Sequence, residues 1–134
     1  MRFLLDTHYA IELADRYANG LNEPDLLDWA QENGELIISI ATLWEVAIKS
    51  RLGKLPLRLR VEIWPEMFAV LEILLLPIID KHILADIGPE PDTRDPFDRL
   101  LLGVASAESC RLLTKDRKLA EHPLAWRDIP LKNK

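Results

Sequence analysis

Short apolar runs alternate along this chain with longer stretches in which apolar residues recur at helical spacing. The short runs, several of them rich in β-branched residues, predict buried strands at residues 3–5, 36–40, 75–79 and 111–114, with a final short strand around 126–129. The periodic stretches predict helices over residues 8–16, 25–33, 41–53, 80–86 and 96–109, and another that begins around Trp64. Strands alternating with helices predict an α/β fold around a mostly parallel sheet.

Capping residues and helical spacing predict where several of these helices end and which faces they bury. Gly34 is expected at the left-handed position that follows the second helix, and Gly53 is expected to stop the third. Asp80 is expected to cap the short helix that runs to residue 86. For the helix that begins around Trp64, spacing predicts one apolar face, formed by Met67, Val70, Leu71 and Leu74.

The stretch RDPFDRLL at residues 94–101 has the signature of a helix start. Pro96 suits the first helical position, where its missing N–H is not needed. Asp95 would then be the N-cap, accepting a hydrogen bond from a free N–H of the first turn. Asp98 falls at the third helical position, where the positive end of the helix dipole favours an acid. Both aspartates are therefore explained by helix geometry, and a functional role for either needs support from elsewhere in the chain.

Composition indicates one globular domain over residues 1–134, with 49% hydrophobic and 29% charged residues. The single cysteine, Cys110, cannot form an intrachain disulfide and is expected to be an inert buried thiol, as suits a reducing compartment. The longest apolar run, residues 73–79, is interrupted by Pro77 and falls far short of the roughly 20 residues that span a bilayer. With no leader peptide apparent at the N-terminus, the sequence predicts a cytoplasmic protein with no membrane association.

Charge is unevenly distributed along the chain. The net charge is −5 at neutral pH, which argues weakly against nonspecific binding to a nucleic acid duplex. Residues 49–60, however, hold five basic side chains and no acid: Lys49, Arg51, Lys54, Arg58 and Arg60. This basic segment is a candidate RNA-binding surface, and the alternative is an ordinary solvated turn around Gly53 and Pro56.

Four acidic residues are the main candidates for chemistry. Asp6 and Asp116 each follow a predicted strand, and parallel strands of one sheet end at the same edge, where ligands bind in folds of this class. Glu45 lies inside the apolar block 43–48, where an isolated charge is costly. Together with Asp98 they predict a site for Mg²⁺ or Mn²⁺, ions that prefer oxygen ligands and assist phosphodiester hydrolysis. The sequence predicts a site for either one ion or two.

Each acid also has an explanation that involves no metal. Asp6 could cap the first helix, and Asp116 could open a turn. Glu45 could form a helical ion pair with Lys49, four residues on, worth a few tenths of a kcal/mol.

Other chemistries find less support in the sequence. The three histidines, His8, His82 and His122, show no zinc-type spacing and are expected to be surface or capping residues. The chain has neither a glycine-rich phosphate loop nor a G-x-S-x-G elbow.

Four blocks of sequence, in this order, resemble the motifs of PIN-domain proteins and most of all the VapC-type toxins of bacterial toxin–antitoxin pairs. The blocks are LLDTH at 4–8, ISIATLWEVAIKSRLGKL at 38–55, RDPFDRLLLGVA at 94–105 and LLTKD at 112–116. The resemblance implies a three-layer α/β/α domain with a central parallel sheet and a Mg²⁺- or Mn²⁺-dependent endoribonuclease. It also implies a homodimer that is inhibited by a VapB-like antitoxin.

The resemblance assigns roles to individual residues. The four acidic positions of the family fall on Asp6, Glu45, Asp98 and Asp116, the implied metal-binding and catalytic residues. Thr7 and Thr114 stand where related proteins carry a hydroxyl that hydrogen-bonds near the metal, and Asp95 is implied to be a supporting residue.

The sequence departs from the family pattern in two places. Thr93 occupies a place where related sequences often have histidine, so a substrate contact from that position is in doubt. Residues 11–13 lack a tryptophan that is common in related sequences, which leaves the dimer and antitoxin surfaces open.

Two other functions compete with a metal-dependent ribonuclease. One is a phosphotransfer domain in which Asp6 is the nucleophile, but haloacid-dehalogenase-like phosphatases have a second aspartate where this chain has His8. The other is a non-catalytic protein-binding module whose acids only cap helices.

Overall fold

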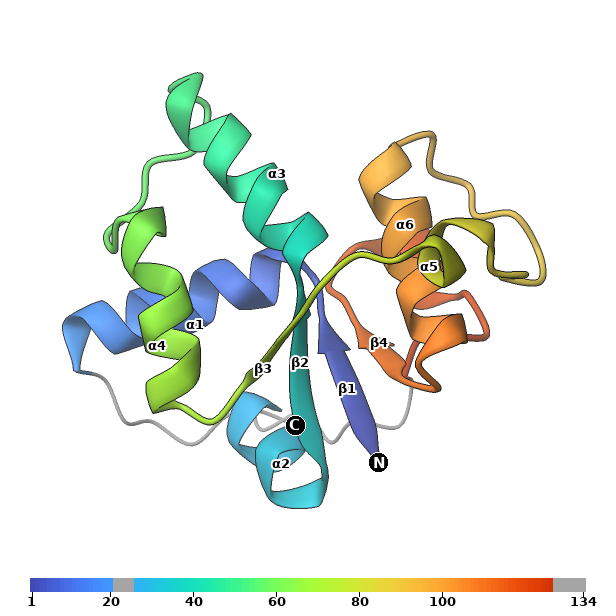
Figure 1. Ribbon diagram of the computed structural model, residues 1–134, viewed down its shortest axis with the longest axis horizontal. Helices are drawn as coiled ribbons and strands as arrows, with labels where there is room; N and C mark the ends of the chain where they lie inside the picture. The colour runs from blue at the N-terminus through green and yellow to red at the C-terminus, as the bar shows by residue number, and fades with distance from the viewer. Residues whose placement is uncertain (21–25, 127–134) are drawn as a thin grey trace.

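A parallel four-stranded sheet forms the centre of the molecule. The computed structural model describes residues 1–20 and 26–126. In the described residues the sheet has the order β3-β2-β1-β4, and every neighbouring pair is parallel (Figure 1). Its strands are β1 (Arg2–Leu5), β2 (Glu35–Ser39), β3 (Leu74–Leu76) and β4 (Arg111–Leu113).

Seven α-helices and one 3₁₀ helix accompany the strands in the described part of the chain. They are α1 (Thr7–Asn19), α2 (Leu26–Asn33), α3 (Ile40–Arg51), the 3₁₀ helix η1 (Val61–Ile63), α4 (Trp64–Val70), α5 (Asp80–Leu84), α6 (Pro96–Ala107) and α7 (Arg117–Ala120). All of the predicted helices are present, with ends that differ by a few residues from those expected.

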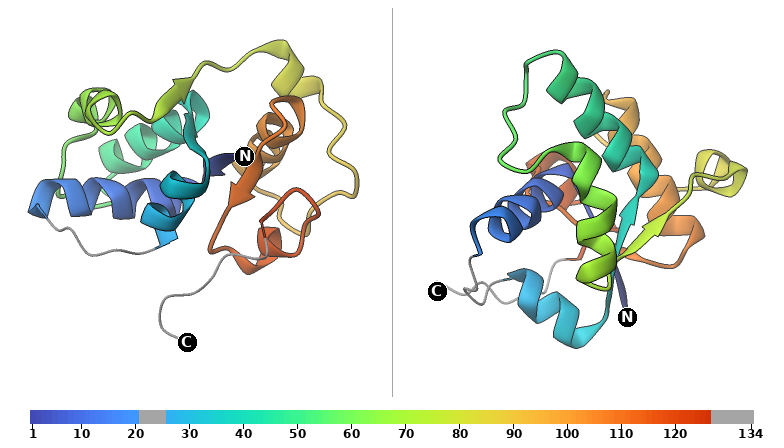
Figure 2. Two further views of the ribbon diagram at one scale, coloured as in Figure 1. Left: turned by 90° about the horizontal axis from the view of Figure 1, so that it is seen from below. Right: turned by 60° about the vertical axis from the view of Figure 1, so that its left-hand side comes forward.

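Each face of the sheet packs on its own hydrophobic core, because successive side chains of a strand point to opposite faces. Phe3 and Leu5 belong to one core, which they share with residues of α1 and α4. Leu4 lies in the other core, against the buried face of α6. Figures 1 and 2 show helices on both sides of the sheet. The predicted three-layer α/β/α fold is therefore confirmed.

The third predicted strand is shorter than expected, and most of the fifth lies outside the described residues. The third was expected at 75–79, but β3 ends at Leu76 because Pro77 has no N–H to donate to the sheet. Of the strand expected around 126–129, residues 127–129 lie outside the described residues. Ala125, just before it, forms a single parallel bridge with Leu112.

Three local expectations about helices were wrong. Asp80 is the first residue of α5 and not its cap; the backbone N–H of Ile79 instead donates to the His82 ring. Gly34 does not adopt the left-handed conformation. It is needed for close approach, because a Cβ there would lie 2.1 Å from the Met1 carbonyl oxygen. Val70 is 61% exposed, because α4 ends there and Glu72 turns the chain with a positive φ.

The face of α4 that is buried consists of Trp64, Met67 and Phe68. Leu74, which was expected on that face, belongs to β3 instead.

Two histidines are buried and cap backbone N–H groups, the second of the two roles that were expected for them. The His82 ring accepts from Ile79 through Nδ1 and contacts Glu108 Oε2 through Nε2 at 2.8 Å. The His122 ring accepts from Leu124 and contacts the Pro89 carbonyl. These distant partners are what allow two polar rings to be buried.

Cys110 is buried, as expected, and burial raises the pKa of its thiol. Within the described residues, no helix is long and apolar enough to cross a membrane.

Candidate functional site

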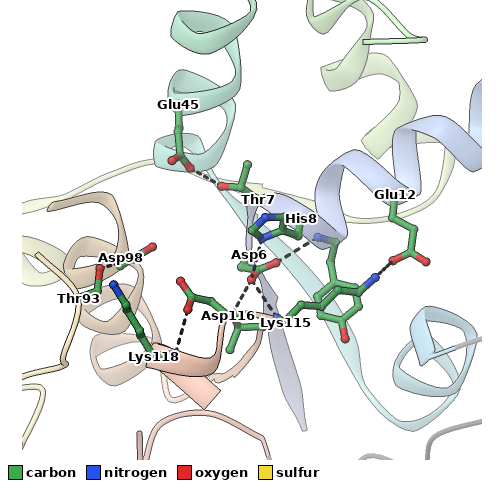
Figure 3. Close-up of polar contacts among 12 residues, drawn as sticks. Asp6, Thr7, His8, Glu12, Glu45, Thr93, Asp98, Lys115, Asp116 and Lys118 are labelled. Carbon is green, nitrogen blue, oxygen red and sulfur yellow. Dashed lines mark hydrogen bonds and ion pairs between the residues drawn. The ribbon is translucent and has the colours of Figure 1, made fainter. Parts of the chain in front are cut away.

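A cavity of about 180 Å³ opens at the edge of the sheet where the strands end. All four of the acidic residues singled out from the sequence line it, and Asp95 does so as well. Asp6 follows β1, Asp116 follows β4, Glu45 lies on α3 after β2, and Asp98 lies in the first turn of α6 (Figure 3). Four elements that are far apart in the sequence thereby bring four carboxylates to one place.

Asp6 is the most constrained of these acids and is only 4% exposed. Its Oδ1 accepts from the Tyr9 backbone N–H at 3.1 Å, so Asp6 caps α1. Its Oδ2 accepts from the Thr114 hydroxyl at 2.5 Å and from the Lys115 N–H at 3.3 Å. The pairing of β1 with β4 sets this contact, because Leu5 and Leu113 are in register. Capping and a place in the cavity are therefore compatible.

Glu45 is 6% exposed and is held by two partners. The Thr7 hydroxyl donates to Oε1, and the Lys49 ammonium lies 2.8 Å from Oε2. The helical ion pair considered from the sequence is therefore present. The hydrogen bond to Glu45 raises the pKa of Lys49; burial opposes the rise, and the charges of Asp95 and Asp98 add to it.

Asp98 carries the clearest electrostatic signature in the cavity. Burial raises the pKa of its carboxyl, the hydrogen bond from Thr93 opposes the rise, and the charges of Asp95, Asp116 and Glu45 add to it. The Thr93 hydroxyl donates to Asp98 Oδ2 at 2.8 Å. Like charges disfavour ionisation of a neighbouring carboxyl, so the cavity favours entry of positive charge.

Asp95 and Asp116 both cap helices. Asp95 accepts from the Phe97 N–H at 2.9 Å and so begins α6, as the sequence predicted. Asp116 accepts from the Lys118 N–H at 2.9 Å and begins α7. Its own N–H donates to the Thr114 hydroxyl at 3.0 Å, which links the Asp116 turn to the partner of Asp6.

The basic segment divides into two parts. Lys49 lines the acidic cavity. The other four residues, Arg51, Lys54, Arg58 and Arg60, are exposed at the end of α3 and in the turn before η1. Arg60 has a long ion pair of 3.9 Å with Glu62. The structure does not bring these four residues to the cavity lining.

The donor chemistry of the cavity fits a hard divalent ion, because most of its donors are carboxylate and hydroxyl oxygens, with the His8 ring beside them. Within residues 1–20 and 26–126, no three histidine, cysteine, aspartate or glutamate side chains stand close enough to form a ready-made metal site. The carboxylates are instead engaged by threonine hydroxyls, backbone N–H groups and Lys49. Binding an ion would therefore require these side chains to adjust.

Sequence reasoning missed two contributors to the site. Thr93 was noted only as a departure from the family pattern, yet it bridges the Asp95 N–H and the Asp98 carboxylate. His8 was expected at the surface; it is exposed, but it also lines the cavity, with Nδ1 3.9 Å from Asp6 Oδ2. The sequence did hold a signal for this position of His8, because the residue directly follows the LLDT run that ends β1.

Comparisons with known proteins agree with this architecture. The structure is similar to that of VapBC2 from Rickettsia felis bound to a DNA fragment from their promoter, with a TM-score of 0.58 and 20% sequence identity. The match covers 93% of this chain and 96% of that chain, and at this identity it concerns the fold alone. A search of the curated proteins found no match. The family model of the PIN domain matches residues 3–123, and the chain belongs to this family.

Proposed function

We propose that this protein is a Mg²⁺- or Mn²⁺-dependent endoribonuclease and the toxin of a VapBC-type toxin–antitoxin pair. The observation that carries the proposal is the convergence of Asp6, Glu45, Asp98 and Asp116 on one cavity at the carboxyl edge of the sheet. Membership of the PIN domain family supports it.

The four carboxylates are the proposed metal-binding and catalytic residues. A divalent ion bound by them would lower the pKa of a water molecule and neutralise charge on the substrate phosphate. Thr7 and Thr114 orient Glu45 and Asp6 through their hydrogen bonds. Asp95 supports the site by fixing the start of α6, which carries Asp98.

The remaining parts of the proposal concern partners. The exposed residues of the basic segment offer positive charge to the RNA backbone. A VapB-like antitoxin is the proposed inhibitor, and the VapBC complex among similar structures supports this partner. We further propose that the protein acts in the cytoplasm as a homodimer.

The two competing functions are less well supported. As a phosphotransfer domain, the chain lacks the second aspartate of haloacid-dehalogenase-like phosphatases, because His8 stands at that place. Trapping a phosphoryl or beryllofluoride group on Asp6 would favour that function. A protein-binding module would not explain why acids from four elements share one cavity, and calorimetry with Mn²⁺ separates it from a metal enzyme.

Cleavage of RNA by the purified protein is the direct test. Structured RNA is incubated with Mg²⁺ or Mn²⁺, and the rates of the parent, Asp98→Asn and Asp80→Asn are compared. Asp80 is exposed on α5, so Asp80→Asn controls for the substitution itself. We expect Asp98→Asn to lose at least about a hundredfold in rate and EDTA to stop cleavage, because the charge that binds the ion is removed.

Cleavage by Asp98→Asn at the parental rate, with no effect of EDTA, would refute the metal assignment. Growth arrest on induction in a bacterial host, relieved by the product of an adjacent antitoxin gene, tests the toxin role separately.

A further inference from the structure

Lys49 occupies a different environment from the rest of the basic segment. Its ammonium lies 2.8 Å from Glu45 Oε2, and its side chain lines the same cavity as Asp95 and Asp98. The Glu45 side chain is 7% exposed, whereas that of Lys49 is 46% exposed. The cation therefore reaches from the solvent into a cavity that five carboxylates line, together with Thr7, His8 and apolar side chains.

Glu45 has no carboxylate oxygen without a partner in this arrangement. Oε1 accepts from the Thr7 hydroxyl, and Oε2 is bound by Lys49. A buried carboxylate needs such partners, because an unpaired charge in the interior is costly. The neutral Thr7 hydroxyl leaves a lone pair free on Oε1, whereas the Lys49 cation repels a second cation that approaches Oε2. This agrees with the lack of a ready-made metal site among the described residues.

We propose that Lys49 is the internal counter-ion of this cavity, which neutralises Glu45 in the metal-free protein and must release Oε2 before Glu45 can bind a divalent ion. The proposal rests on the proposed metal-dependent function and deepens it by naming the residue that sets metal affinity. The release needs no movement of α3, because four rotatable bonds separate the ammonium from the backbone and half of the side chain is already in solvent.

The alternative is an ordinary helical ion pair. Lys49 follows Glu45 by one helical turn, and exposed pairs with this spacing contribute only a few tenths of a kcal/mol. In that case removing Lys49 would change neither the metal-free stability nor the metal affinity appreciably. An internal counter-ion has two measurable consequences that differ in sign: its removal destabilises the metal-free protein and strengthens metal binding.

The experiment compares the parent with Lys49→Met, Lys49→Arg and Lys54→Met. Methionine keeps most of the apolar stem without the charge, and arginine keeps the charge. Lys54 belongs to the same basic segment but is exposed and does not line the cavity, so Lys54→Met matches the change in net charge. The melting temperature is measured in EDTA, and the Kd for Mn²⁺ is measured by calorimetry without RNA.

We expect Lys49→Met to bind Mn²⁺ about tenfold more tightly, because the ion no longer displaces a cation from Glu45. In EDTA this variant should melt about 2–5 °C lower than the parent. Adding Glu45→Gln should restore part of the lost melting temperature and remove the gain in Mn²⁺ affinity. Lys49→Arg and Lys54→Met should remain close to the parent in both measurements.

Two failures can be told apart. If the parent binds Mn²⁺ and Lys49→Met binds it equally or more weakly, the counter-ion role is wrong while the metal-dependent function stands. If no variant binds Mn²⁺, both proposals are refuted. Should Lys49→Met not fold, Lys49→Gln takes its place in the same comparison, with the same two outcomes.

Discussion

At the scale of single residues, the site is organised by threonines. Three hydroxyls each donate to one carboxylate of the cavity: Thr7 to Glu45, Thr93 to Asp98 and Thr114 to Asp6. A carboxylate held by a hydrogen bond keeps one orientation, which is what a site needs before its ligand arrives. The sequence pointed to Thr7 and Thr114. It could not point to the role of Thr93, because the hydrogen bond depends on how the loop before α6 folds.

Asp98 is expected to reduce the stability of the metal-free protein. Burial and neighbouring carboxylates raise its pKa, so the folded state disfavours the ionised form and loses stability as the pH rises through that pKa. Asp98→Asn should therefore melt about 1–3 °C higher than the parent at pH 7 in EDTA. The difference should shrink as the pH falls below this raised pKa, because the parental carboxyl is then protonated as well.

Thermal unfolding in EDTA across a pH series from 7 downwards checks this prediction, with Asp80→Asn as the control. A lower melting temperature for Asp98→Asn at pH 7 would contradict it.

Asp95 is expected to act mainly on stability. Its carboxylate accepts from the Phe97 N–H, and removing an N-cap costs about 1 kcal/mol. Asp95→Ala should therefore lower the free energy of unfolding by about that amount in urea titrations, while Asp95→Asn, which can still cap, should cost less. A loss of cleavage by Asp95→Asn as large as that of Asp98→Asn would instead place Asp95 among the catalytic residues.

At the scale of elements, α6 and α3 carry the greatest constraints. The N-terminus of α6 positions Asp98, and its middle packs against α5 so closely that a Cβ on Gly103 would lie 2.0 Å from the His82 carbonyl oxygen. The helix α3 carries Glu45 and Lys49 into the cavity and then ends in the exposed basic segment. One helix thereby connects the acidic cavity to the proposed RNA-binding surface.

The basic segment is expected to bind RNA through its phosphate groups. Arg58→Glu should weaken binding to single-stranded RNA and reduce the slope of log affinity against log salt concentration by about 0.7 for each phosphate that is no longer neutralised. Fluorescence anisotropy across a salt series, in EDTA so that no RNA is cleaved, measures both quantities. Lys81→Glu is the control, because it makes the same change of charge on the exposed side of α5, away from the basic segment. An unchanged slope would remove this segment from the RNA-binding surface.

At the scale of the whole molecule, the parallel sheet determines where chemistry is possible. All four strands run in the same direction, so residues that follow β1 and β4 meet at one edge, and α3 and α6 approach it from the two sides of the sheet (Figure 1). The sheet itself is buried in two apolar cores. The acids are concentrated at the edge because the faces of the sheet are apolar and ligands of such folds bind where the strands end.

The molecule is expected to be a homodimer in solution. Light scattering during size-exclusion chromatography should give twice the chain mass of 15.4 kDa at micromolar concentration, in EDTA as well as in Mg²⁺. The physical reason is that several large apolar side chains, among them Ile83 and Leu84 on α5, are exposed on the isolated chain and would be covered by association. A mass of one chain across the concentration range would contradict the prediction.

Patterns within a few residues determined much of this protein from the sequence alone. Apolar periodicity indicated the buried strands and the helices, and alternation of the two indicated a parallel sheet. Asp95 could be assigned as a cap because capping depends on neighbours two or three residues away. The expectation that acids after β1 and β4 share an edge followed from strand direction alone.

Only the tertiary structure decided which distant segments meet. It pairs the His82 ring with Glu108, brings Gly34 against Met1, and joins Thr93 to Asp98. It also separates Lys49 from the other basic residues, a distinction that net charge and spacing cannot make. These features depend on the angle and depth at which helices pack against the sheet, and such packing is the sum of many small interactions that no single stretch of sequence specifies.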